Sequence, residues 1–161
     1  MDFSAESRVW IYQADRFFTD AEAAEIQQNL NEFTASWLAH GHQLAAKGEL
    51  LDKLFLVFTV DENKAGATGC SIDKSVAFVK SVETTYGVNF FDRFQVAYLE
   101  DGQLRRSDKS GFQQLVASGY VADSTIVFNN LVQTKAEMDQ KWKQPFSESW
   151  HSRVFSKQAV G

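Results

Sequence analysis

The residues best suited to chemistry lie in one segment, from Lys64 to Ser75, which combines glycines, hydroxyls, a thiol and lysines. The segment follows an apolar run and precedes a helical pattern. Glycines in such a place let backbone N–H groups point at a ligand, and a helix start adds partial positive charge. The segment therefore predicts an anion-binding loop for a small molecule. Its candidate ligand-binding residues are Gly66, Thr68, Gly69, Cys70, Ser71, Lys74 and Ser75.

This segment differs from a phosphate loop of an ATPase. Lys74 and Ser75 resemble the end of such a loop, but a Walker A motif has glycine directly before the lysine and a second glycine five residues earlier. Asp73 and Thr68 occupy those two positions. A carboxylate at position 73 would repel phosphates. We therefore do not expect ATP hydrolysis by a P-loop.

Two weak catalytic candidates share the segment. Cys70 is the only cysteine, and a helix start is a position that activates thiols. Ser71 and Lys74 have the Ser-x-x-Lys spacing of a serine nucleophile and its base, but the companion motifs are absent. The alternatives are a buried, inert Cys70 and a helix capped by Ser71 with a solvated Lys74. The sequence favours these alternatives over catalysis.

Neither a metal site nor a cofactor is predicted. His40 and His42 lie two residues apart, without a third ligand at a usual spacing.

Aromatic residues are concentrated in the last twenty positions. One hypothesis is that they anchor an interface, such as that of a homodimer, because aromatic side chains are common interface anchors. The alternative is that the tail folds back onto the sheet or the helices. The candidate interface residues are Trp142, Phe146, Trp150 and Phe155.

Composition limits the class of protein and its location. The chain of 161 residues is 44% hydrophobic and 14% aromatic, which predicts a packed interior. Its net charge of −5 indicates no basic face for nucleic acid. The longest apolar run, Leu54–Phe58, is far shorter than the roughly 20 residues of a membrane span. The acidic N-terminus does not resemble a signal peptide, and one cysteine allows no internal disulfide, so we expect a cytoplasmic protein.

Local patterns predict the elements that position these residues. Thr19 and Glu22 have the spacing of a capping box, and Asp101-Gly102 is typical of a hairpin turn. Gly119 is expected to end the helix that begins at Ser107 or Asp108. Strands are predicted over 8–13, 43–47, 53–60, 94–100, 103–106 and 125–128, and further helices over 19–38, 71–86 and 133–143.

The order of these elements predicts an α+β fold. Through residue 100 the order is β-α-β-β-α-β, the ferredoxin-like layout with helices on one face of an antiparallel or mixed sheet. A C-terminal ββαβ lobe and the aromatic tail follow. We expect a single domain over 1–161, with possible sub-lobes 1–92 and 93–161. A cone-shaped α+β fold of similar element order is the rival.

Five segments carry a resemblance to known proteins, and they are Val9–Gln13, Gly69–Val76, Phe91–Arg93, Ile126–Val132 and Ser149–His151. Together they resemble, over nearly the whole chain, a family of short bacterial proteins commonly labelled "ABC transporter ATPase". The label implies a nucleotide-driven transporter subunit. The chain is shorter than an ABC ATPase domain and has no LSGGQ-like signature, so ABC-type ATP hydrolysis is not expected.

A local resemblance covers roughly residues 95–130. Asp101-Gly102, Leu115–Val121 and Asp123–Phe128 are similar to the GYF-like modules of bacterial proteins, which pair a hairpin with a short helix and a strand. Val121 stands where the diagnostic phenylalanine would follow Gly119-Tyr120. The resemblance implies a lobe made for protein contacts.

No complete catalytic motif occurs in the chain, so the sequence predicts a non-catalytic binding or protein-interaction protein that self-associates. Two alternatives stay open. One is a protein that binds an anionic small molecule at the loop, and the other is a small enzyme that uses Cys70, or Ser71 with Lys74.

Overall fold

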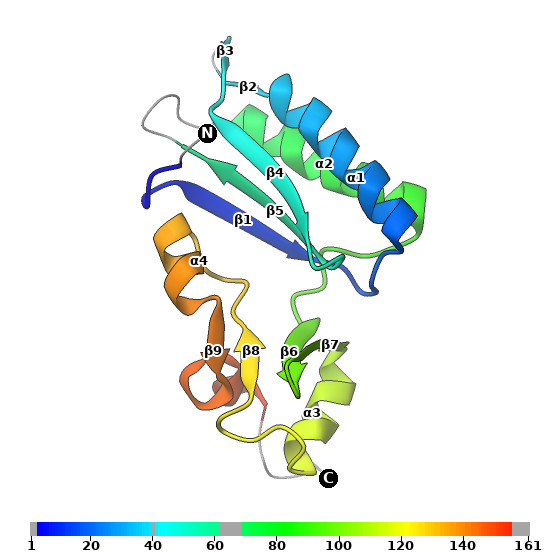
Figure 1. Ribbon diagram of the computed structural model, residues 1–161, viewed down its shortest axis with the longest axis vertical. Coiled ribbons are helices and arrows are strands. Elements are labelled where there is room, and N and C mark those ends of the chain that lie inside the picture. Colours follow the sequence, from blue (N-terminus) through cyan, green and yellow to red (C-terminus); the bar gives the residue numbers. More distant parts are fainter. Residues whose placement is uncertain (1–2, 40, 62–68, 156–161) are drawn as a thin grey trace.

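The computed structural model describes residues 3–39, 41–61 and 69–155, and within them the chain forms two lobes along its longest axis (Figure 1). Each lobe contains an antiparallel sheet with helices packed on it. We call the lobe that runs from β1 to α2 the N-lobe and the one from β6 to α5 the C-lobe. The α+β fold class is therefore confirmed.

The N-lobe sheet has the strand order β1-β5-β4, and a short β2–β3 hairpin stands beside it. All residues of the central strand β5 are buried, as the apolar sequence of this segment predicts. Helices α1 and α2 lie side by side on one face of the sheet (Figure 1). The elements are β1 (Arg8–Gln13), α1 (Asp20–Ala35), β2 (Leu38–Ala39), β3 (His42–Gln43), β4 (Ala46–Leu51), β5 (Phe55–Val60) and α2 (Gly69–Tyr86).

Helix α1 begins at the predicted capping box. The Thr19 hydroxyl accepts a hydrogen bond from the Glu22 N–H at 3.1 Å, and the Glu22 carboxylate accepts one from the Thr19 N–H at 2.9 Å. The helix ends at Ala35, three residues before the predicted end. The reason is Trp37, which leaves the helix, buries its ring and donates from Nε1 to the Ser71 carbonyl at 2.8 Å. This bond ties the end of α1 to the start of α2.

The C-lobe sheet has the strand order β7-β6-β8-β9. Asp101 and Gly102 join β6 to β7 with positive φ angles of 50° and 77°, which is the hairpin turn that the sequence predicts. The elements are β6 (Val96–Glu100), β7 (Gln103–Ser107), α3 (Lys109–Ala117), β8 (Ile126–Phe128), α4 (Lys135–Lys141), β9 (Lys143–Pro145), the 3-10 turn η1 (Phe146–Glu148) and α5 (His151–Val154).

The pairing of strand β6 determines which strands belong to each of the two sheets. The β-α-β-β-α-β order is present through β6, with the β2–β3 hairpin added. In the ferredoxin-like layout, however, β6 would join the first sheet. Here it pairs with β7 on one side and with β8 on the other. Both of its edges are thereby occupied, so the N-lobe sheet keeps three strands.

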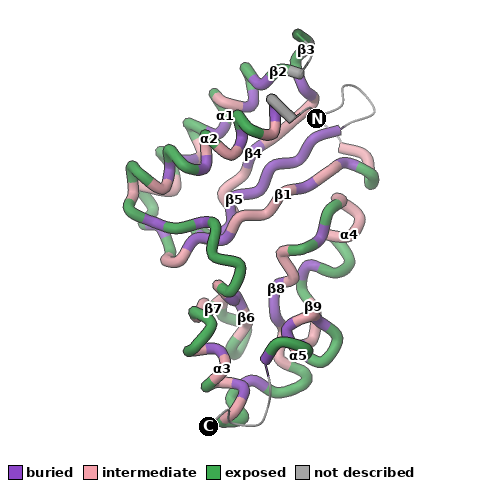
Figure 2. Tube along the Cα trace, turned by 180° about the vertical axis from the view of Figure 1, so that it is seen from behind, coloured by how far each residue is buried: buried purple, intermediate pink, exposed green. Residues whose placement is uncertain are grey.

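The two lobes share packed aromatic residues. Phe55 of β5 stacks on Phe128 of β8, with ring centroids 5.2 Å apart, and meets Trp142 edge-on at 4.9 Å. The segment that follows β8 then runs along β1, where the Val9 N–H donates to the Gln133 carbonyl at 3.0 Å. Figure 2 shows the buried residues of β5 and β8 on the two sides of this junction. The junction fixes the positions of the residues that form the cavity described below.

Candidate functional site

The predicted anion loop lies partly outside the described residues, which do not include Gly66 and Thr68. Gly69 and Cys70 are the first two residues of α2, and the Cys70 side chain lies outside the described part. Ser71, Lys74 and Ser75 are placed on the first turns of α2.

The described part of this loop does not bring its candidates together. Ser71 and Ser75 are buried, and the Ser75 hydroxyl donates to the Ile72 carbonyl at 2.6 Å. Lys74 is exposed on the solvent side of α2. Ser71 and Lys74 therefore point to different environments. Anion binding and catalysis at this loop stay predictions.

The aromatic tail folds back onto the chain, which is the alternative to an interface. Trp142, Phe146 and Phe155 are 2–7% exposed. Trp142 packs against Phe55, whereas Phe155 meets the Phe112 ring of the C-lobe core edge-on at 4.9 Å. These three side chains are therefore packed in the interior of the protein. Trp150, the fourth candidate, is only partly buried and lines a cavity.

Two features are absent from residues 3–39, 41–61 and 69–155, the part of the chain that the structure describes. No three His, Cys, Asp or Glu side chains gather so that they could hold a metal ion. No helix in the same ranges has the length and apolar character needed to cross a lipid bilayer.

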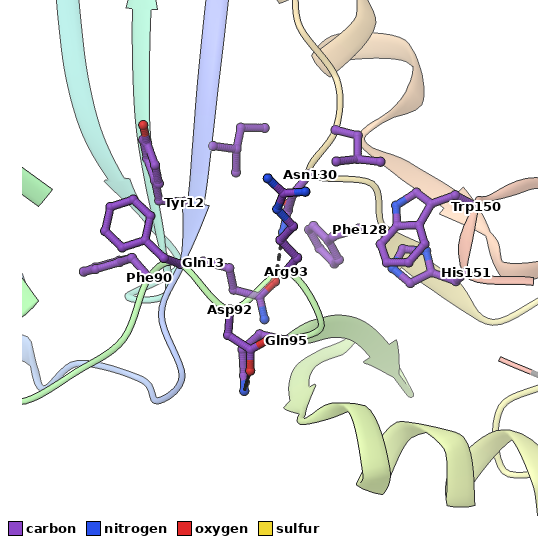
Figure 3. A pocket seen from close by; sticks show the side chains of 13 residues that line it. Tyr12, Gln13, Phe90, Asp92, Arg93, Gln95, Phe128, Asn130, Trp150 and His151 are labelled. Carbon is purple, nitrogen blue, oxygen red and sulfur yellow. Dashed lines mark hydrogen bonds between the residues drawn. The ribbon is translucent and has the colours of Figure 1, made fainter. Parts of the chain in front are cut away.

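A cavity of about 490 Å³ lies between the lobes (Figure 3). Its walls come from the end of β1, the link between α2 and β6, the end of β8 with the residues after it, and the start of α5. The lining residues are Ile11, Tyr12, Gln13, Phe90, Phe91, Asp92, Arg93, Gln95, Phe128, Asn130, Leu131, Trp150 and His151.

Gln13, at the end of β1, leaves one hydrogen-bond donor in this cavity without a partner. The Trp142 indole can only donate, so the Asn130 atom 2.8 Å from it is the carbonyl Oδ1. The Asn130 amide nitrogen therefore faces Gln13 and donates to Gln13 Oε1 at 2.9 Å. Gln13 is only 5% exposed, and its Nε2 finds no acceptor among the described residues. The orientation of this amide is fixed by the hydrogen bonds behind it.

A second unpaired donor comes from the start of α5. The Trp150 Nε1 is buried and has no partner within the described residues. The Trp150 ring stacks on the His151 imidazole, with ring centroids 3.8 Å apart and planes 23° from parallel. The stack fixes the orientation of the indole at the cavity wall.

His151 contributes to the cavity as a neutral ring. Burial lowers the pKa of His151 to about 4, because the interior disfavours the charged imidazolium. Its Nδ1 lies 2.7 Å from the Ser149 hydroxyl. At neutral pH this histidine therefore brings no positive charge to the cavity.

Charge in the cavity lining comes from two neighbouring residues, Asp92 and Arg93. The Asp92 carboxylate is already used, since it accepts from the Phe94 N–H at 2.9 Å and from Gln95 Nε2 at 3.2 Å. The Arg93 guanidinium has no ion pair or hydrogen bond with any other described residue. Figure 3 shows it extending into the space between Gln13 and Phe128. The cavity lining thus has two buried donors without described partners, and its one cation forms no ion pair with another described residue.

The sequence predicted little of this site. Of the cavity residues, only Trp150 was a candidate, and it was assigned to an interface. Four of the five segments that carry the family resemblance nevertheless meet at the cavity; the exception is Gly69–Val76. Those segments are the one sequence signal that could have located the site.

None of the family models, curated proteins or solved structures compared with this chain matches it. The class of protein therefore rests on the fold and the site: an α+β protein of two lobes with a donor-rich cavity between them. The resemblance to the short bacterial family stays a prediction.

Proposed function

We propose that this protein is a non-catalytic binding protein that takes a small organic molecule into the cavity between its lobes. The observation that carries this proposal is the buried Gln13 amide, which lines the cavity and whose Nε2 has no acceptor among the described residues. A buried donor left without a partner costs about 1–3 kcal/mol. A ligand that supplies the acceptor would remove this cost.

The size and lining of the cavity support the same conclusion. Its volume of about 490 Å³ falls within the roughly 300–1,000 Å³ of typical ligand pockets. The walls are largely aromatic, with Phe90, Phe128 and Trp150 among them, and a few polar groups stand between these rings. Such a combination favours a planar apolar body with hydrogen-bond acceptors at its edge.

The lining also favours binding over catalysis. The residues that form it include no serine, threonine, cysteine or lysine, and both oxygens of its one carboxylate, Asp92, already accept hydrogen bonds. The Ser149 hydroxyl next to His151 is buried and lies outside the lining. We therefore assign His151 a role in shaping the wall.

A proton–nitrogen correlation NMR titration with 2-naphthamide, a neutral planar probe with an acceptor, tests the proposal. The Trp150 indole and Gln13 amide signals are expected to shift as the probe saturates the cavity. The Trp37 indole is an internal control, because it already donates to the Ser71 carbonyl away from the cavity. Unchanged Trp150 and Gln13 signals at millimolar probe would refute the proposal.

A pair of variants assigns the binding to this cavity. Trp150→Phe removes an indole N–H that has no described partner but keeps an aromatic ring over His151, so the fold is retained. It should weaken binding of the probe several-fold. Trp10→Phe makes the same chemical change on β1 outside the cavity lining and should leave the affinity unchanged. Equal effects of the two variants would place the probe elsewhere.

A further inference from the structure

We infer that the ligand of the cavity is an anion, a planar aromatic carboxylate whose charged group is bound by Arg93 together with Gln13. This inference rests on the proposed function and names its ligand class. Both residues line the same cavity, and Figure 3 shows both side chains in its lining. The ring of the ligand would then lie against the aromatic walls.

The charged groups of the cavity lining favour an anionic ligand over a neutral one. A guanidinium offers five N–H donors in a planar fork that matches the two oxygens of a carboxylate. No N–H donor of the Arg93 guanidinium makes a hydrogen bond to another described residue. The carboxylate of Asp92 forms no ion pair with Arg93, and its two oxygens accept hydrogen bonds from the link before β6 instead. An external carboxylate would pair with Arg93.

The second donor fixes where the carboxylate binds. Gln13 Nε2 is oriented by the chain of hydrogen bonds from Trp142 through Asn130. The plane of this buried amide is therefore fixed, whereas the Arg93 side chain is exposed. A carboxylate bound by both residues would accept a hydrogen bond from the Gln13 amide and form an ion pair with the Arg93 guanidinium. A neutral ligand would accept the hydrogen bond from Gln13 but would leave Arg93 without an ion pair.

Long-range attraction does not explain such binding, because the whole chain carries a net charge of −5 and repels anions at a distance. The preference for an anion must come from contact with Arg93. Salt should therefore weaken binding of an anionic ligand only modestly, and it should leave binding of a neutral one unchanged.

The test compares 2-naphthoate with 2-naphthamide, which have the same ring system and differ in charge. Dissociation constants are measured by calorimetry or NMR titration for the wild-type protein, Arg93→Gln and Arg105→Gln. Arg105 is the matched control: it lies exposed on β7, outside the cavity lining, and its loss changes the net charge equally. We expect wild-type protein to bind naphthoate about tenfold more tightly than naphthamide, as one charge-assisted contact predicts.

The outcomes separate the two proposals. Arg93→Gln should abolish the preference for naphthoate and leave naphthamide binding unchanged, while Arg105→Gln should retain the preference. If wild-type protein binds both probes equally, or if Arg93→Gln keeps the preference, the anion inference is overturned and the binding function stands. If neither probe binds, both proposals fail.

Discussion

His151 makes the stability of this protein dependent on pH in a defined window. Its side chain is 1% exposed and is surrounded by aromatic rings, with the Phe112 centroid at 6.2 Å and the Phe155 centroid at 6.4 Å. Its polar partner is the Ser149 hydroxyl. Burial of the ring lowers the pKa of His151 from 6.5 to about 4.

The sign of the effect follows from which state binds the proton first. Above pH 6.5 the histidine is neutral in both the folded and the unfolded chain, and stability does not depend on it. Between pH 6.5 and about 4 the unfolded chain is protonated while the folded one is not, so the free energy of unfolding falls as the pH falls. A shift of this size corresponds to a loss of about 3 kcal/mol at pH 4.

Urea unfolding of the wild-type protein and of His151→Asn, measured at intervals from pH 7.5 to 4, checks this prediction. Asparagine keeps a polar partner for Ser149 but does not titrate. The wild-type free energy of unfolding should fall by about 3 kcal/mol more than that of the variant across the window. Glu22 does not interfere, since hydrogen bonds from Arg16 and the Thr19 backbone lower its pKa to about 2, and its contribution is lost only below about pH 4.5. Parallel pH profiles for the two proteins would refute the reasoning.

Urea unfolding of further variants tests two packing contacts, one within each lobe, and the cap of helix α1. Gly48→Ala should destabilise by about 1–3 kcal/mol, because the new Cβ would lie 2.8 Å from Leu30 Cδ2 in the core; a stabilised variant would show that α1 and β4 can separate. Thr19→Ala removes the acceptor for the Glu22 N–H and should cost about 1 kcal/mol, whereas Thr19→Ser should cost far less; equal losses would exclude the cap. Phe112→Ala opens the C-lobe core and should cost about 3–5 kcal/mol; a loss below about 1 kcal/mol would contradict the packing described for this lobe.

The elements of this fold follow from short stretches of sequence. The capping box at Thr19 and Glu22, the spacing of Ile26 and Leu30 on α1, and the Asp101-Gly102 turn each depend on residues a few positions apart. Their physical causes are local: a side chain satisfies a nearby N–H, or a backbone adopts a positive φ. The apolar composition of β5 likewise marks it as a central strand, because both of its faces must be covered.

The site depends on partners that no local pattern reveals. The hydrogen bond between Gln13 and Asn130 joins residues 117 positions apart, and Arg93 reaches the same cavity from the link between the lobes. The sequence directed attention to Lys64–Ser75, where glycines and hydroxyls are adjacent in the chain. Ser71 and Ser75 of that segment instead face the interior and support the start of α2.

The sequence by itself determined the longer helices, most of the sheet strands and the α+β class, because these depend on local periodicity and turn chemistry. It did not predict the β2–β3 hairpin, β9 or α5, and it placed a strand over 43–47 where β4 spans Ala46–Leu51. Only the tertiary structure decided that β6 pairs in the second sheet, that the aromatic tail packs inward and that a cavity opens between the lobes. The physical reason is that strand pairing and hydrogen-bond satisfaction depend on the whole packed chain. That Gln13 Nε2 has no partner among the described residues follows only from the positions of all the groups packed around it.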